Sequence, residues 1–175
     1  GQDLREDVLV HLRVLIERHA RERRAAQCIR IVRAEQLELL PGSKRAPDIA
    51  VITNIYPDHL NRYPSIKSYA LAKANIFKDQ TENDILVLNK KNKWTKFFLA
   101  QKPRSRIAYF PFKLGVDSKT FIEKYGHHNF ENLMAASLAA VKAGVSKKAI
   151  TQSISSLLFL KFREQSILQR KNLLV

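Results

Sequence analysis

The stretch Ala50–Gln80, AVITNIYPDHLNRYPSIKSYALAKANIFKDQ, decides the fold of this chain. An apolar strand pattern at its start leads into a polar turn that carries Asp58 and His59. Apolar residues then recur at helical spacing over 66–78, which predicts a helix carrying Lys73. A strand end, an acid–histidine pair and a lysine on the next helix can converge at the carboxyl edge of an α/β sheet. Ligands bind at that edge in open α/β folds.

Alternating strand and helix patterns continue downstream of this stretch. Strand, helix, strand, helix, strand in succession is typical of a parallel sheet with crossover helices. We therefore predict an α/β fold, with a parallel sheet flanked by helices. Gly144 is expected to end one helix, and Ser146 is expected to cap the next. The expected strands are 48–54, 84–88 and 106–110, the expected helices are 4–27, 66–78, 93–101, 129–143 and 147–158, and 39–47 is expected to be a loop.

Length and composition limit the class of protein. The 175 residues suffice for one domain with a hydrophobic core. Cys28 is the one cysteine in the sequence, which excludes an intrachain disulfide and suits a reducing cytosol. No apolar run reaches the length of a membrane span, and no secretory signal is recognised, so a cytoplasmic protein is expected.

The charge is strongly positive and unevenly composed. Lys plus Arg number 31 against 16 Asp plus Glu, which gives a formal net charge of +15. Such a charge predicts weak, sequence-independent and salt-sensitive attraction to nucleic acid. Residues 1–43 contain arginine but no lysine, whereas lysine dominates from Lys44 onward. We therefore hypothesise that residues 1–34, an Arg-rich helical segment, have a different origin from the rest of the chain.

Two motifs resemble the central, ATP-binding domain of the Mur ligases, the ATP-dependent amide ligases of peptidoglycan precursor synthesis. The family pattern is T-N, D-H-L-D and Y-x-x-A-K in this order, followed by G-x-H-N-x-x-N at the head of a later helix. The order and separation of the two motifs make the resemblance much more specific than either motif alone. The matching residues are Thr53-Asn54, Asp58-His59-Leu60, Tyr69 with Ala72-Lys73, and Gly126, His128-Asn129 and Asn132; Asn61 stands where the family has aspartate.

The resemblance implies a catalytic or binding role for five of these positions. His59 would bind Mg²⁺, and Lys73 would do so as a carbamate, because a neutral amine can take up CO₂ and become an anionic oxygen ligand. Asp58 would orient His59, or would serve only the local turn. Asn129 and Asn132, which share one helix face, would bind ATP. The alternatives are a turn histidine without function, a solvated lysine and, for Asn129, an ordinary N-cap.

The implied activity is the ligation of D-glutamate to UDP-N-acetylmuramoyl-L-alanine, with ATP and Mg²⁺. The run Arg62-Tyr63-Pro64 is most similar to the family member with that activity. No G-x-x-G-K-[ST] phosphate loop occurs in the 175 residues, so the chain alone is expected to be inactive. The expected division is the segment 1–34, a partial Mur ligase central domain over 35–158, and an unassigned tail over 159–175. The alternatives are a basic nucleic-acid-binding module and an inert fragment of a split gene.

Overall fold

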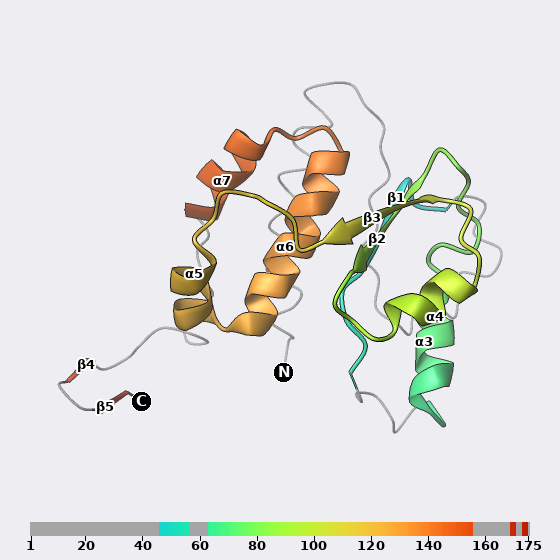
Figure 1. The fold of residues 1–175 in the computed structure, drawn as a ribbon, viewed down its shortest axis with the longest axis horizontal. Coiled ribbons are helices and arrows are strands. Elements are labelled where there is room, and N and C mark those ends of the chain that lie inside the picture. The colour runs from blue at the N-terminus through green and yellow to red at the C-terminus, as the bar shows by residue number, and fades with distance from the viewer. Residues whose placement is uncertain (1–45, 57–62, 156–168, 171–172, 175) are drawn as a thin grey trace.

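A three-stranded parallel sheet organises the molecule (Figure 1). The computed structural model describes residues 46–56, 63–155, 169–170 and 173–174. The sheet order is β1-β2-β3, and Ile52 of β1 pairs with Leu88 of β2, which in turn pairs with Tyr109 of β3. The predicted α/β class with a parallel sheet is thereby confirmed. The strands are β1 (Ile49–Ile52), β2 (Ile85–Asn89) and β3 (Arg106–Phe110).

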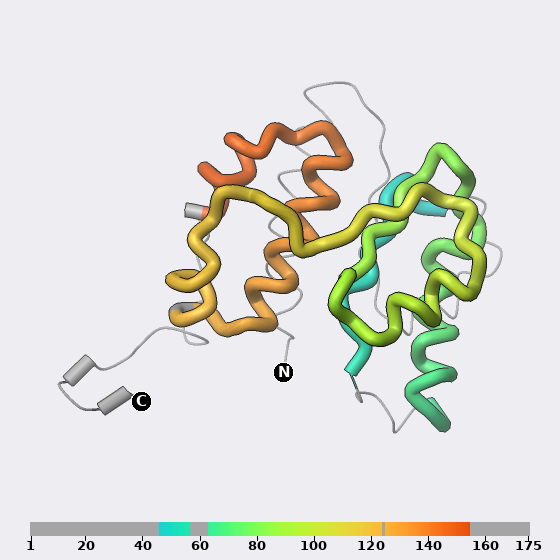
Figure 2. Tube along the Cα trace, in the orientation of Figure 1, coloured from blue at the N-terminus to red at the C-terminus, as the bar shows by residue number. Residues whose placement is uncertain are grey.

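Helices cover both faces of the sheet, and Figure 2 follows the chain from one face to the other. Two short crossover helices lie on one face; α6 lies on the other and contacts all three strands, and α5 and α7 pack against α6 (Figure 1). A short antiparallel pair, β4 with β5, is described near the carboxyl terminus. The helices are α3 (Ile66–Ala74), α4 (Thr95–Ala100), α5 (Ser118–Tyr125), α6 (His127–Lys142) and α7 (Lys147–Ser155), and the last two strands are β4 (Gln169–Arg170) and β5 (Leu173–Leu174).

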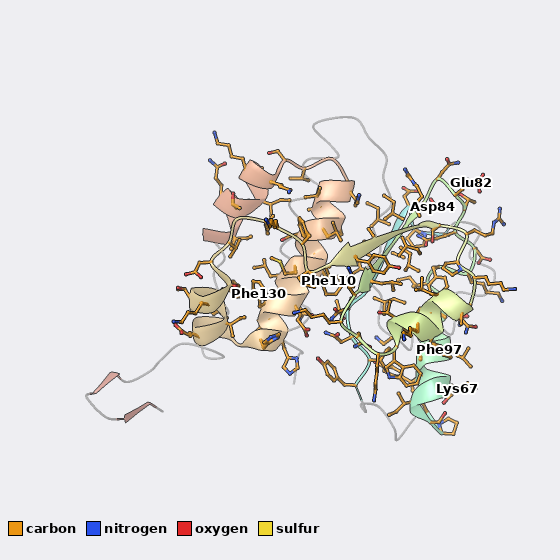
Figure 3. The ribbon with its side chains drawn as sticks, in the orientation of Figure 1. Lys67, Glu82, Asp84, Phe97, Phe110 and Phe130 are labelled. Atoms are coloured by element: carbon orange, nitrogen blue, oxygen red, sulfur yellow. The ribbon has the colours of Figure 1, made fainter. Side chains whose placement is uncertain are left out.

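Alternation along the strands builds two hydrophobic layers. Successive side chains of a strand point to opposite faces, so Ile49 of β1 joins the layer beneath α6, and Ala50 joins the layer beneath α3 and α4. Both faces of a parallel sheet are covered, which explains the near-continuous apolar runs. Figure 3 shows Phe110 between the sheet and α6, and Phe97 on α4 at the opposite face.

Local signals at helix ends agree with the expected boundaries of several helices. The Ser65 hydroxyl accepts a hydrogen bond from the Ser68 N–H at 3.1 Å, which caps α3. Gly144 follows the end of α6. A residue there must adopt a left-handed conformation, and Gly144 does so at φ +92°. The Ser146 hydroxyl accepts from the Ala149 N–H at 3.2 Å, as expected for a cap of α7.

The structure corrects three sequence-based expectations. Helix α5 was not predicted, although Asp117 caps it by accepting a hydrogen bond from the Lys119 N–H at 3.0 Å. Helix α3 ends at Ala74 and is followed by turns, so the predicted helix over 66–78 is too long. Asn129 is not the N-cap of α6, because that helix begins at His127. The predicted helix over 4–27 and most of the predicted loop over 39–47 lie outside the described residues.

Candidate functional site

A cluster of amide and carboxylate side chains lies where the carboxyl ends of β1 and β2 meet the start of α6. Asn54 follows β1, Asn89 is the last residue of β2, and Asn92 lies in the loop after β2. Glu131 comes from the first turns of α6. These four residues are called the edge network below. The predicted convergence of polar groups at this edge therefore has a structural counterpart, although most of its members differ from the residues singled out in the sequence.

Asn54 is the centre of the edge network. Its Nδ2 donates to Glu131 Oε2 at 2.9 Å, and its Oδ1 accepts from Asn89 Nδ2 at 2.8 Å and from Asn92 Nδ2 at 2.9 Å. Asn89 Nδ2 also approaches Glu131 Oε1 at 3.4 Å. Because the oxygen faces two donors and the nitrogen faces a carboxylate, only one orientation of the Asn54 amide satisfies all of its neighbours.

Backbone groups fix the other two asparagines. The Asn89 Oδ1 accepts from the Lys91 N–H at 2.9 Å, and the Asn92 Oδ1 accepts from the Trp94 N–H at 2.8 Å. Short polar side chains that bond to the backbone two residues ahead form such turns readily. The loop after β2 therefore holds its asparagines in position before they reach Asn54.

Tyr56 and His128 extend the edge network toward the surface. The Tyr56 hydroxyl lies 3.2 Å from His128 Nδ1 and 3.5 Å from Glu131 Oε2. The two rings meet edge to face, with centroids 5.3 Å apart. His128 is the histidine of the G-x-H-N-x-x-N motif, so this contact brings the motif against the segment that follows β1.

The two predicted nucleotide-binding residues differ in how their amides are used. Both are buried, Asn129 at 7% exposure and Asn132 at 3%. Asn129 Nδ2 donates to the Tyr125 carbonyl at 2.8 Å and so links α6 to the end of α5. Asn132 Nδ2 has no hydrogen-bond partner in the part of the chain that the structure describes. A buried amide without a partner is unfavourable by about 1–3 kcal/mol, and such a group calls for an explanation.

Lys73 lies in the last turn of α3 and is half-buried. Its Nζ lies 5.0 Å from the centroid of the Tyr69 ring, and Tyr69 in turn packs on Tyr63 with centroids 5.1 Å apart. An ammonium over a ring face is a favourable cation–π contact. A carbamate is an anion and would not make this contact, so carbamylation would require the Lys73 side chain to leave Tyr69.

The remaining predicted site residues, Asp58 and His59, lie outside the described residues. Within the described part, no group of three or more His, Cys, Asp or Glu side chains is arranged to hold a metal ion. The same part of the chain contains no helix that is long and apolar enough to cross a bilayer.

Positive charge surrounds the loop after β2. Exposed lysine side chains of this loop and of α4 extend into solvent close to the edge network, so they create a positive potential that attracts anions such as phosphates. The one carboxylate of the edge network, Glu131, is already engaged by amide donors. The exposed lysines of this loop and of the helix that follows are Lys90, Lys91, Lys93 and Lys96.

Comparison with known proteins settles the family. The sequence pattern of the Mur ligase middle domain matches residues 32–124, which is more than half of the chain. The chain belongs to the Mur ligase family. The predicted resemblance is thereby confirmed, and the match includes the whole three-stranded sheet with α3 and α4.

Curated relatives of this Mur ligase chain carry the name UDP-N-acetylmuramoylalanine–D-glutamate ligase. Those of Staphylococcus saprophyticus and Staphylococcus carnosus are each 32% identical over 78% of this chain and 34% of their own length. A solved structure of a UDP-N-acetylmuramoyl-L-alanyl-D-glutamate–2,6-diaminopimelate ligase superposes with a TM-score of 0.59 at 25% identity, over 79% of this chain and 34% of that one. The chain thus spans about a third of the length of the proteins it matches.

Sequence reasoning overlooked most of the edge network of this Mur ligase chain. Asn54 belongs to the T-N motif and Glu131 occupies a variable position of G-x-H-N-x-x-N, but neither was given a role, and Asn89 and Asn92 were not singled out. A usable signal was present, because Asn89 ends a buried strand and a polar side chain at such a place faces the carboxyl edge of a parallel sheet. The role of Glu131 has no such signal, since it depends on how α6 lies across that edge.

Proposed function

We propose that this chain provides the nucleotide-binding part of an ATP-dependent ligase that joins D-glutamate to UDP-N-acetylmuramoyl-L-alanine. The names of its relatives support the choice of reaction and substrates. The observation that carries the proposal is the buried amide of Asn132, which has no hydrogen-bond partner among the described residues. It lies at the start of α6, beside the carboxyl edge of the sheet, where nucleotides bind in open α/β folds.

A bound nucleotide would provide the missing partner. The Asn132 Nδ2 can donate to an acceptor nitrogen of adenine, and this bond would remove the cost of an unpaired buried donor. Asn129 would act differently, since its hydrogen bond to the Tyr125 carbonyl holds the start of α6 against α5. The exposed lysines that follow β2 would attract the phosphates without contacting the base.

Magnesium would be held by His59 and by a carbamylated Lys73 in this proposal. When bound, the ion neutralises phosphate charge and stabilises the charge that develops as the carboxylate is activated. Within this chain, Lys73 has to exchange its contact with Tyr69 for a contact with the ion, as described above. A test of this step is mass spectrometry of the chain with and without bicarbonate, which should reveal a carbamate that is absent from Lys73→Ala.

We expect the chain alone to bind nucleotide without completing the ligation. Charge stabilisation around transferring phosphates is worth several kcal/mol of barrier, and the sequence contains no G-x-x-G-K-[ST] loop to supply it. The chain should release no phosphate when it is mixed with ATP, Mg²⁺, UDP-N-acetylmuramoyl-L-alanine and D-glutamate. Phosphate release that depends on both substrates and is abolished by His59→Ala would overturn this expectation.

Isothermal titration calorimetry with ATP and with ADP tests the binding claim. Asn132→Leu, which keeps the size of the side chain and removes the donor, should weaken both nucleotides at least about tenfold, equivalent to about 1.4 kcal/mol. The matched control is Asn83→Leu at an exposed turn, which should leave the affinity within about twofold. Equal affinity in the unmodified chain and in Asn132→Leu would refute the assignment of Asn132.

A further inference from the structure

Glu131 is the residue by which α6 joins the edge network. It lies on α6, and its carboxylate accepts hydrogen bonds from Asn54 after β1 and from Asn89 at the end of β2. We propose that Glu131 is a positioning residue for nucleotide binding, because it holds the ends of β1 and β2 against the start of α6 and so orients Asn132. This inference rests on the proposed function.

The edge network is a clamp and does not form a ligand site. Each polar atom of the Asn54 amide is engaged, since its nitrogen faces Glu131 and its oxygen accepts from Asn89 and Asn92. Both carboxylate oxygens of Glu131 also face donors. A ligand that bound these groups would have to break existing hydrogen bonds, whereas Asn132 Nδ2 offers an unused donor on the adjacent residue.

The start of α6 needs such a clamp because it lacks a side-chain cap. Gly126, at φ +83° and ψ 160°, separates α5 from α6, and because it has no side chain it cannot cap the helix with a side-chain hydrogen bond. That combination of angles is essentially restricted to glycine. In the described part of the chain, Asn129 forms a side-chain hydrogen bond toward α5, and His128 and Glu131 form side-chain hydrogen bonds toward the segments after β1 and at the end of β2.

The clamp also joins the two sequence motifs. Asn54 belongs to the T-N motif that leads into Asp58 and His59, and Glu131 lies between the two asparagines of G-x-H-N-x-x-N. The two residues are 77 positions apart in the chain and 2.9 Å apart through Nδ2 and Oε2. A hydrogen bond to a carboxylate is stronger than one between neutral groups. Glu131 thereby sets the relative placement of the segments that carry the two motifs.

The chemistry of the clamp provides a reciprocal test. Glu131→Gln places its amide nitrogen against the donor of either Asn54 or Asn89, and Asn54→Asp places a second carboxylate against Glu131, so each single change breaks the match. The double variant Asn54→Asp/Glu131→Gln restores it. Gln at 131 then donates to Asp at 54, and the carboxylate of that Asp still accepts from Asn89 and Asn92. Glu123→Gln, on the exposed surface of α5, makes the same chemical change outside the network.

The experiment measures ATP affinity by calorimetry and the side-chain amide signals of Asn132 by ¹H–¹⁵N NMR, on the full chain. We expect Glu131→Gln to weaken ATP about tenfold and to shift the Asn132 NH₂ signals even without nucleotide. The double variant should recover affinity to within about threefold and return the signals toward their original positions. Glu123→Gln should change neither readout.

A purely structural role would give a different pattern. Glu131→Gln would then lower the melting temperature while ATP affinity and the Asn132 signals stayed unchanged, and this result would overturn the inference. Absence of ATP binding by the unmodified chain would refute the proposed function. The inference would then be decided by the nucleotide-free spectra, where a shift in Glu131→Gln that is reversed in the double variant supports it and no shift overturns it.

Discussion

Replacing Asn54 with alanine should destabilise the fold, because Asn54 is the centre of the edge network. The substitution removes one hydrogen bond to the Glu131 carboxylate and two from the amides of Asn89 and Asn92. It also leaves Asn89, Asn92 and Glu131, which are buried or half-buried, without their hydrogen bonds to Asn54. The effect should therefore exceed that of an ordinary surface substitution, which is within about 0.5 kcal/mol.

The expected magnitude follows from the three lost bonds. Two bonds between neutral amides are worth about 1 kcal/mol each, and the bond to a carboxylate is worth about 1.5 kcal/mol. Asn54 is only half-buried, so water replaces part of this interaction. We therefore expect the free energy of unfolding to fall by about 2 kcal/mol.

Urea unfolding followed by tryptophan fluorescence measures this change directly. Trp94 is the one tryptophan of the chain. Its backbone N–H donates to Asn92 Oδ1 within the same loop, so the probe lies beside the perturbation. Asn83→Ala, at an exposed turn, is the matched control and should cost less than about 0.5 kcal/mol. Equal unfolding free energies for Asn54→Ala and Asn83→Ala would refute the reasoning about the edge network.

Three further predictions concern the stability of the described domain. Asn132→Leu should leave the unfolding free energy, measured in urea, unchanged or raise it by up to about 1 kcal/mol, because it removes an unpaired buried donor. A decrease in the unfolding free energy of more than about 1 kcal/mol would instead show that the amide stabilises the fold. Leu133→Ala should cost about 3 kcal/mol in the same assay, since Leu133 is 0% exposed, whereas Leu71→Ala, at a site that is 44% exposed, should cost under about 0.5 kcal/mol. Hydrogen bonds from the Thr120 hydroxyl and the Lys119 N–H lower the pKa of Asp117 below its ordinary value of 3.8, so this carboxylate stabilises the fold above pH 3.8 and the stabilisation is lost as the pH falls through the lower, folded-state pKa. Thermal melts should accordingly show Asp117→Ala to be less stable than the unmodified chain at pH 7 and the difference to shrink as the pH falls below 3.8, and a difference that is independent of pH would contradict this.

The sheet could be predicted from the sequence because its strands are buried on both faces. Runs such as 84–88 are short, apolar and bounded by polar residues, which leaves few alternatives to a buried strand. The end of α3 was predicted less well for a physical reason. Ile76 and Phe77 are buried at helical spacing, yet they lie in turns after Ala74, so burial continues the pattern where the helix has stopped.

The edge network was beyond reach of the sequence for a different reason. Its contacts join residues 35 to 77 positions apart, and they exist only because α6 crosses the carboxyl edge of the sheet at one particular place. Local patterns describe elements and their faces, but they do not fix how two distant elements meet. The helix α5, by contrast, had a local signal, because Asp117 followed by Thr120 matches an N-cap and its first turn.

The most direct test of the central claim is a crystal structure of the full chain with a non-hydrolysable ATP analogue. The account predicts density for the adenine beside the start of α6, with an acceptor nitrogen within hydrogen-bond distance of Asn132 Nδ2 and the edge network intact. An analogue bound elsewhere, or an Asn132 amide that remains unpaired beside a well-defined nucleotide, would contradict it.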